Sequence, residues 1–291
     1  MRPSSEYLDK IIEQTALEPV KVLDHGFIRV VDYCGNETSV IKAARQSYSA
    51  DPVPRKPSED RNLIRYLVRH RHTTPLEMCE LALQVKLPIF VARQWIRHRM
   101  ANTNELSGRY TELPREFYVP DLTQIKNQST NNKQGRGEQL GLEDAQRIRD
   151  LMVTDANTSF DNYDTLLNVY DLARELARTN LPLSTYTTWT WKTDLHNLLH
   201  FLSLRLDSHA QYEIRVYADI IWQWIRGWVP EIAEAFNDYR LESISFSKQE
   251  QMVLRQMISG IRPSDLDCYG TSVLASRELA EFKEKMSKLW L

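Results

Sequence analysis

The segment MCELALQVKLPIFVARQWIRHR, residues 78–99, joins a strand pattern to a helix pattern through a single proline. The second half of residues 78–87 alternates apolar and polar side chains, which is typical of a half-buried strand. Pro88 closes this strand and also falls in the first turn of the following helix, where proline is tolerated. The sequence therefore predicts a strand that leads directly into a helix.

The sequence on both sides of this segment predicts a mixed α/β (α+β) fold, with a central twisted sheet and long flanking helices. Residues 20–33 and 184–191 are rich in β-branched or aromatic residues, which favours strands. From Asp194 an apolar pattern continues to about Trp228 and covers nearly the whole circumference, so we expect one long buried helix. We expect further helices to start at Asn36 or Thr38 and at Ser58, and to cover residues 142–176, 247–261 and 272–289.

Residues 121–141 differ in composition from their surroundings. They are polar, contain several glycines and have little to bury, so we expect a mobile surface loop. We assign residues 1–240 to a single catalytic domain that includes this loop, and residues 241–291 to a helical C-terminal extension.

Composition indicates a globular protein of the cytoplasm. Of 291 residues, 42% are hydrophobic, and 37 Lys and Arg stand against 39 Asp and Glu, which gives a net charge of −2. This balance argues against a dedicated nucleic-acid binder. No apolar stretch reaches the roughly 20 residues that span a bilayer, and the first ten residues lack a signal-peptide pattern. We therefore expect neither nucleic acid nor membrane as a partner.

The three cysteines, Cys34, Cys79 and Cys268, are scattered along the chain without a CxxC pair. Their odd number and their spacing indicate neither a disulfide framework nor a thiolate zinc site. No cysteine lies beside a histidine in a setting typical of a nucleophile. We expect three reduced thiols.

Basic residues crowd the end of the helix in the opening segment. Arg93, Arg97, His98 and Arg99 lie close to apolar residues, and residues 102–109 then form a polar turn. Cations near a helix C-terminus offset the macrodipole and can remain solvated there. Alternatively, these groups are partly buried and bind phosphates, because the forked guanidinium group matches phosphate oxygens.

Arg205 and two histidines lie on the long buried helix. On this apolar helix Arg205 needs an anionic or carbonyl partner, and helical spacing offers Asp207 or Glu213 for an intrachain ion pair. His196 and His200 are four residues apart and share a helix face, a spacing that also occurs in metal sites. The glutamate that follows the first histidine in helical zinc proteases is absent, so structural histidines remain the alternative.

A short motif of His72, Thr74 and Glu77 has two interpretations. Thr74 and Glu77 have the spacing of a helix capping box. The motif also gathers an imidazole, a hydroxyl and a carboxylate, but the sequence does not fix their mutual geometry.

Arg97-His98-Arg99, followed after seven residues by Ser107, resembles the signature of the flavin-dependent thymidylate synthases, and Gly108-Arg109-Tyr110 continues it. Other segments resemble the family in the same order and at similar separations. They are His72, Thr74, Glu77, residues 88–95, Arg178 before Leu181-Pro182, and residues 204–213. The resemblance covers about residues 20–235.

This resemblance implies a homotetramer whose active sites are shared between subunits. It implies the reductive methylation of dUMP to dTMP in de novo dTMP biosynthesis. Methylenetetrahydrofolate would supply the carbon, FAD would carry the hydride, and NADPH would be the reductant. It implies no metal, and no enzymic thiol that activates the pyrimidine.

The resemblance also carries the family's site residues over to this chain. Arg205 would be catalytic, facing the uracil ring and stabilising its deprotonated imide. The dUMP contacts would be Gln94, Trp95, Ile96, Arg97, Glu105, Leu106, Ser107, Gly108, Arg109, Arg178 and Arg205, with Ser107 and Arg109 near the phosphate. The FAD contacts would be His72, Thr74, Arg97, His98, Arg99, Glu105, Asp194, Leu195, His196 and His200. Many family members have Asn, Arg and Asn where this chain has Asp194, His196 and His200.

Two other functions compete with this interpretation. A metal-dependent hydrolase would use His196, His200 and a carboxylate. A regulatory module would bind dUMP or FAD without turnover.

Overall fold

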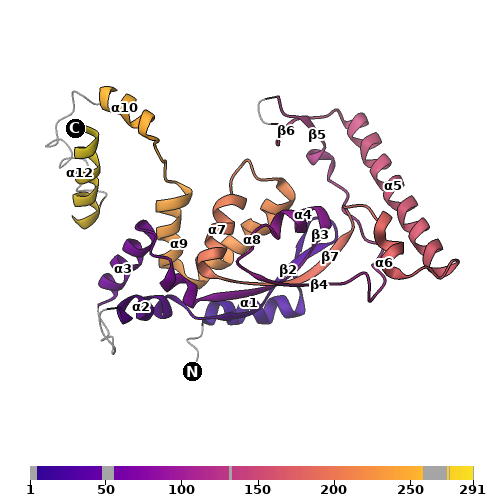
Figure 1. The fold of residues 1–291 in the computed structure, drawn as a ribbon, viewed down its shortest axis with the longest axis horizontal. Helices are drawn as coiled ribbons and strands as arrows, with labels where there is room; N and C mark the ends of the chain where they lie inside the picture. The colour runs from indigo at the N-terminus through magenta and orange to yellow at the C-terminus, as the bar shows by residue number, and fades with distance from the viewer. Residues whose placement is uncertain (1–4, 48–55, 131–132, 258–273, 275, 291) are drawn as a thin grey trace. The chain divides into compact units, whose positions relative to one another are not determined.

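The computed structural model describes residues 5–47, 56–130, 133–257, 274 and 276–290 (Figure 1). The chain divides into two compact units, residues 1–241 and 242–291. Cys268 and parts of the helices predicted at 247–261 and 272–289 lie outside the described residues.

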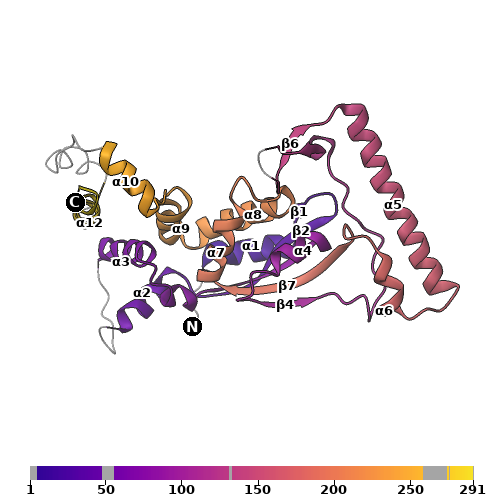
Figure 2. The same cartoon turned by 45° about the horizontal axis from the view of Figure 1, so that its top comes forward.

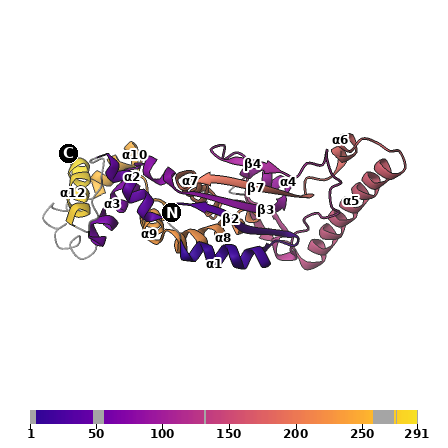
Figure 3. The same ribbon diagram turned by 90° about the horizontal axis from the view of Figure 1, so that it is seen from below.

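An antiparallel five-stranded sheet forms the centre of the first unit. Its strands are β1 (Val20–Val22), β2 (Gly26–Cys34), β3 (Glu80–Pro88), β4 (Asn102–Glu105) and β7 (Tyr186–Asp194). They lie in the order β1-β2-β3-β7-β4, and Figure 3 shows β2, β3, β7 and β4 side by side. The mixed α/β fold with a central sheet is therefore confirmed.

One face of the sheet is the wall of the hydrophobic core. Along β3, Leu81, Leu83 and Val85 are fully buried, while the residues between them are partly exposed. In the register of β3 with β7, Leu83 pairs with Trp191 and Val85 with Trp189, and both tryptophans are buried. The alternation in the sequence thus directs one set of side chains into the core.

Helices cover this buried face. The helices of the first unit are α1 (Glu6–Leu17), α2 (Glu37–Gln46), α3 (Pro57–Arg69), α4 (Ile89–Trp95), α5 (Leu142–Asn168), α6 (Arg174–Ala177), α7 (Leu195–Arg205), α8 (Tyr212–Trp228) and α9 (Pro230–Phe236). The Trp95 ring of α4 stacks on the Phe201 ring of α7, with centroids 4.7 Å apart. Both rings also lie against Trp191 of β7, so α4 and α7 are fixed to the sheet and to each other.

The helix α5 stands apart from the sheet, as Figures 1 and 2 show. A separate apolar cluster joins it to α6 and contains the buried residues Phe160, Tyr163 and Ala177. The segment 121–141, predicted as a loop, contains the short 3-10 helix η2 (Leu122–Gln124) and a hairpin of β5 (Lys126–Gln128) and β6 (Arg136–Gln139). Its mobility stays a prediction.

The second unit contains α10 (Lys248–Met257) and α12 (Ser276–Trp290). These helices contact each other. No helix among the described residues has the length and apolar character that crossing a bilayer requires.

The long helix predicted over residues 194–228 is wrong, because α7 ends at Arg205 and α8 begins at Tyr212. Between them the Asp207 carboxylate accepts a hydrogen bond from the backbone N–H of His209 at 2.8 Å. Such a side-chain-to-backbone bond stabilises a turn and competes with the helix. The helical spacing predicted between Arg205 and Glu213 is therefore absent.

Three smaller expectations also need correction. Residues 102–105 form the edge strand β4 rather than a polar turn, and α5 ends at Asn168 rather than near 176. Polar edge strands lack the apolar alternation that reveals a strand in sequence. Thr74 begins the 3-10 helix η1 (Thr74–Met78), which has no side-chain cap, so the capping box is wrong.

Candidate functional site

The end of α4 and the length of α7 enclose a cavity of about 450 Å³, here called the Arg205 cavity. It is lined by Arg97, His98, Arg99, Met100, Trp191, Thr193, Asn197, His200, Leu204 and Arg205. The segment after α4 is held to the sheet, because the Thr193 hydroxyl donates to the Met100 carbonyl at 2.8 Å. The basic residues 97–99 therefore line the cavity together with residues of α7.

Arg205 and His98 form the direct contact across this cavity. Arg205 Nε donates to His98 Nε2 at 3.3 Å. Burial, together with the charges of Arg205 and His200, lowers the pKa of His98 to about 4. His98 is thus a neutral acceptor near pH 7. Burial also lowers the pKa of Arg205, which is the charged member of its pair with His98.

The cations of the Arg205 cavity have no anionic partner in the described part of the chain. Arg97, Arg99 and Arg205 make no ion pair with a described carboxylate, and none of the described cavity-lining residues is acidic. The alternative that paired Arg205 with Asp207 or Glu213 is therefore wrong. Arg97 and Arg99 are exposed and Arg205 is partly buried. Neighbouring cations without counter-charges favour an anionic ligand.

A second cavity of about 340 Å³ lies beside the first, and His200 lines both. We call it the His72 cavity; it is lined by Leu67, Val68, Arg71, His72, Thr73, Leu76, His196, Leu199, His200, Ser203, Phe236 and Arg240. Its polar lining is basic or hydroxyl-bearing. Burial lowers the pKa of Arg240, and the nearby charge of Arg71 lowers it further. The sequence reasoning missed both arginines, because neither belongs to the recognised signature.

The predicted dUMP contacts at residues 105–109 lie outside these two cavities. Glu105 accepts a hydrogen bond from the Thr187 hydroxyl at 2.7 Å, and Leu106 N–H donates to the Thr188 carbonyl at 2.8 Å. These bonds hold the segment at the sheet edge. Ser107 accepts from the backbone N–H of Arg109 at 3.3 Å, and Arg109 pairs with Glu175 at 3.2 Å.

Arg178 lies beside the turn formed by residues 107–109. A Cβ atom at the buried Gly108 would lie 3.1 Å from Arg178 Cδ, so the absence of a side chain lets the arginine approach the backbone. The structure thus gathers Ser107, Gly108, Arg109 and Arg178 in one place, and Arg97, His98, His200 and Arg205 in another.

Several predicted ligand contacts have structural roles in this chain. Trp95 and Leu195 are fully buried in the core. Asp194 is the N-cap of α7, and its carboxylate accepts from the Asn197 backbone at 2.9 Å and side-chain amide at 2.7 Å. Ile96 is half exposed, and Thr74 is exposed beside the exposed His72. The cavity-lining Asn197 and Trp191 were not predicted; their positions facing the cavity follow from tertiary packing.

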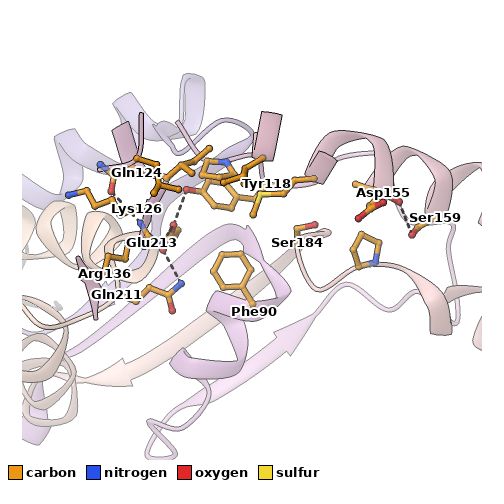
Figure 4. A pocket seen from close by; sticks show the side chains of 17 residues that line it. Phe90, Tyr118, Gln124, Lys126, Arg136, Asp155, Ser159, Ser184, Gln211 and Glu213 are labelled. Carbon is orange, nitrogen blue, oxygen red and sulfur yellow. Dashed lines mark hydrogen bonds and ion pairs between the residues drawn. The ribbon is translucent and has the colours of Figure 1, made fainter. Parts of the chain in front are cut away.

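A third cavity, of about 580 Å³, lies under the hairpin β5–β6 and is here called the Glu213 cavity (Figure 4). Its apolar walls include Phe90 and Tyr118, and its polar end is the fully buried Glu213. Glu213 accepts from Tyr118 at 2.9 Å and from Gln211 at 2.9 Å, and pairs with Arg136. Gln211 in turn accepts a hydrogen bond from the Gln94 amide.

Neither His196 nor His200 forms part of a recognisable metal centre in the described residues. No group of three or more His, Cys, Asp or Glu side chains there is arranged to hold a metal ion. His196 lines the His72 cavity and His200 lies between the two cavities.

Comparisons with known proteins show similarity to one family. A family model described as "Thymidylate synthase complementing protein" matches residues 29–231. A flavin-dependent thymidylate synthase from Gluconobacter oxydans is 53% identical over 251 residues, 86% of this chain and 82% of that protein. One from Rickettsia conorii is 45% identical over 282 residues, 93% of this chain and 94% of that protein.

A solved structure is also similar. The UMP/dUMP methylase PolB from Streptomyces cacaoi, bound with 5-Br dUMP, superimposes with a TM-score of 0.70 at 31% sequence identity. The match covers 77% of this chain and all of that chain.

Proposed function

Because this chain belongs to the flavin-dependent thymidylate synthase family, we propose that it methylates dUMP reductively to dTMP. The observation that supports this function most directly is the Arg205 cavity. Arg97, His98 and Arg99 from the end of α4 meet His200 and Arg205 of α7 there. The three arginines lack a described carboxylate partner, and two nucleotides would supply the negative charge.

The two adjoining cavities fit a flavin dinucleotide. FAD is a long ligand with a negatively charged pyrophosphate between two ring systems, and the cavities share His200 and a basic lining. We propose that Arg97, His98, Arg99 and His200 hold FAD in the Arg205 cavity. His72, Thr74 and His196 would hold it in or beside the His72 cavity. Held there, FAD would supply hydride-transfer chemistry, with NADPH as the reductant and methylenetetrahydrofolate as the carbon donor.

The substrate would lie between the Arg205 cavity and the turn at residues 107–109. Ser107, Arg109 and Arg178 would hold the phosphate, because a hydroxyl and two guanidinium groups provide several donors to its oxygens. Gln94 and Glu105 would orient the nucleoside. The 5-Br dUMP and 5-Br UMP bound by the similar UMP/dUMP methylase support a uridine or deoxyuridine nucleotide as the substrate class.

Arg205 would stabilise negative charge on the uracil ring. Its contact with the neutral His98 fixes Nε and leaves its charge uncompensated by a described acid. A cation held ready in a partly buried site stabilises an imide anion more strongly than one in water. Arg205 would therefore favour the deprotonated base, whose C5 carbon is the better nucleophile.

We propose that the active site is assembled in a homotetramer in the cytoplasm. Within one chain the residues 107–109 line neither of the two basic cavities. An active site shared between subunits would bring the two groups of residues together. The same proposal assigns residues 1–240 to the catalytic domain and residues 241–291 to an extension.

The function is tested by incubating the purified protein with FAD, dUMP, methylenetetrahydrofolate and NADPH. We expect an oxidised-flavin spectrum that NADPH bleaches, and tritium release from dUMP labelled at C5 together with dTMP formation. Reactions that omit each component in turn are the controls. A protein that binds no flavin after addition of FAD, or releases no tritium, would contradict the proposal.

A further inference from the structure

A chain of hydrogen bonds links Gln94, a proposed dUMP contact, to the buried carboxylate of Glu213. The Gln94 amide nitrogen donates to Gln211 Oε1, and Gln211 Nε2 donates to Glu213 Oε2 at 2.9 Å. Tyr118 and Arg136 contact the other carboxylate oxygen. Figure 4 shows Gln211, Tyr118 and Arg136 converging on Glu213. None of the residues beyond Gln94 in this network is a predicted ligand contact.

The carboxylate fixes the direction of this chain. A carboxylate accepts hydrogen bonds, whereas an amide can donate or accept depending on how it is turned. Because Glu213 accepts from Gln211, the Gln211 amino group faces Glu213 and its carbonyl oxygen faces Gln94. That oxygen requires a donor, so Gln94 turns its own amino group toward Gln211. One carboxylate thus orients two amides.

Glu213 has the support that a buried carboxylate requires. Its side chain is 1% exposed, and it receives hydrogen bonds from Tyr118 and Gln211 and an ion pair from Arg136. It also lies in the first turn of α8, where the helix dipole favours negative charge. These contacts hold the oxygens of Glu213 in place as hydrogen-bond acceptors.

We infer that Glu213 is a positioning residue, which directs the carbonyl oxygen of Gln94 toward an N–H or O–H donor of dUMP. The inference rests on the proposed function, because that function places dUMP against Gln94. Glu213 acts through Gln211. With a glutamine at position 213, the hydrogen bonds can run in either direction, and Gln94 can present its amino group to the nucleotide instead.

The first test is Glu213→Gln, which keeps the size of the side chain and removes the fixed acceptor. We expect the Kd for dUMP of the FAD-loaded protein to rise about tenfold, the effect of one mismatched buried hydrogen bond. The affinity for FAD should stay unchanged, because the chain of amides does not reach the two basic cavities. Wild-type affinity for dUMP in this variant would overturn the inference.

A double variant that combines Glu213→Gln with Gln211→Glu separates orientation from simple structural support. It moves the carboxylate one step closer to Gln94, so the acceptor again forces the Gln94 amino group toward position 211. The amide introduced at position 213 can donate to the carboxylate at position 211 and accept from Tyr118. We expect dUMP affinity to recover most of the loss. A folded double variant that binds dUMP no better than Glu213→Gln would overturn the inference.

Two further variants keep the test decisive if Glu213→Gln does not fold. Gln211→Met breaks the link to Gln94 but leaves Glu213 with Tyr118 and Arg136, and should weaken dUMP binding by a similar factor. Tyr118→Phe removes one donor without reversing an amide, and should bind dUMP like the wild type. Normal dUMP affinity in Gln211→Met would overturn the inference.

The wild-type protein distinguishes the two levels of the proposal. If it forms dTMP while the position 211 and 213 variants bind dUMP normally, only the role of Glu213 fails. If the wild-type protein does not bind dUMP at all, the proposed function fails.

Discussion

The charged side chains Arg205 and Glu213 differ in how far other side chains of the protein compensate their charge. Glu213 is fully buried and receives hydrogen bonds or an ion pair from three described side chains. Arg205 is partly buried and its described side-chain partner is a neutral histidine. The protein therefore surrounds the Glu213 carboxylate with its own donors, whereas the Arg205 guanidinium group is available to a ligand.

This difference predicts that removing each of the two charges changes the stability of the fold in a different way. A satisfied buried charge lowers stability when it is removed, because its partners lose their counterpart. A charge without a protein partner has the opposite signature, since its removal relieves desolvation and abolishes a ligand contact. The variants that follow test the contrast between these two regions.

Removal of Arg205 should give the largest effect. In Arg205→Ala we expect dTMP formation to fall by about 10²- to 10³-fold, because the charge on the uracil ring loses its stabilising cation. Flavin should stay largely bound, and the Tm should not fall. Steady-state rates, flavin spectra and thermal melts check these three points. Arg147→Ala, on the exposed surface of α5, is the matched control. Unchanged turnover would remove Arg205 from catalysis.

Removal of Glu213 should lower stability as well as dUMP affinity. In Glu213→Ala we expect the free energy of unfolding to fall by about 3 kcal/mol, because Tyr118, Gln211 and Arg136 lose their common acceptor. Chemical denaturation followed by fluorescence measures this change. Glu143→Ala serves as control, since Glu143 is exposed and its contact with Arg147 is 3.7 Å long. Equal stability of the two variants would break the comparison.

Ser107→Ala tests an uncharged member of the proposed substrate site. The hydroxyl is one donor among several to the phosphate, so we expect the Kd for dUMP to rise by about five-fold while turnover at saturation is retained. Equilibrium titration with dUMP, with Thr158→Ala as a control hydroxyl on exposed α5, measures the change. Loss of all turnover with normal dUMP affinity would give Ser107 a direct part in the chemistry.

The smallest expected effect is a change in the pH dependence of the Tm in a His98 variant. The pKa of His98 in the folded protein is about 4, below its ordinary value of 6.5, so the unfolded chain binds the proton more readily. The stability due to neutral His98 is therefore complete above pH 6.5 and is lost as pH falls toward 4. We expect His98→Gln to show a shallower loss of Tm over this interval. Parallel melting curves from about pH 7.5 to about pH 4 test this, and identical slopes would contradict it.

Local patterns in the sequence were sufficient to predict the central elements of the fold. The alternation before Pro88 predicted β3, and the residues after it predicted α4. The turn at Asp207 was missed because its apolar neighbours continue the helical pattern on both sides. The polar strand β4 was missed because backbone groups make its hydrogen bonds to β7, and its side chains carry no apolar alternation.

The candidate site was predicted in part for a similar reason. The signature from Arg97 to Arg109 comes from one stretch of sequence and was recognised through its spacing. Arg71, Arg240 and Gln211 reach the cavities from separate elements, and no local pattern distinguishes them from surface residues. The buried position of Trp95 also depends on the packing of Phe201 and Trp191 around it.

The position of His200 on the wall between the two basic cavities has a consequence for inhibitor design. Two weakly binding fragments, one in each cavity, would be neighbours across a single imidazole. A short linker over that ring would make the binding of the second fragment intramolecular, and the gain in affinity would need no additional contact. The same geometry means that a resistance substitution at His200 would alter the contacts of both fragments together.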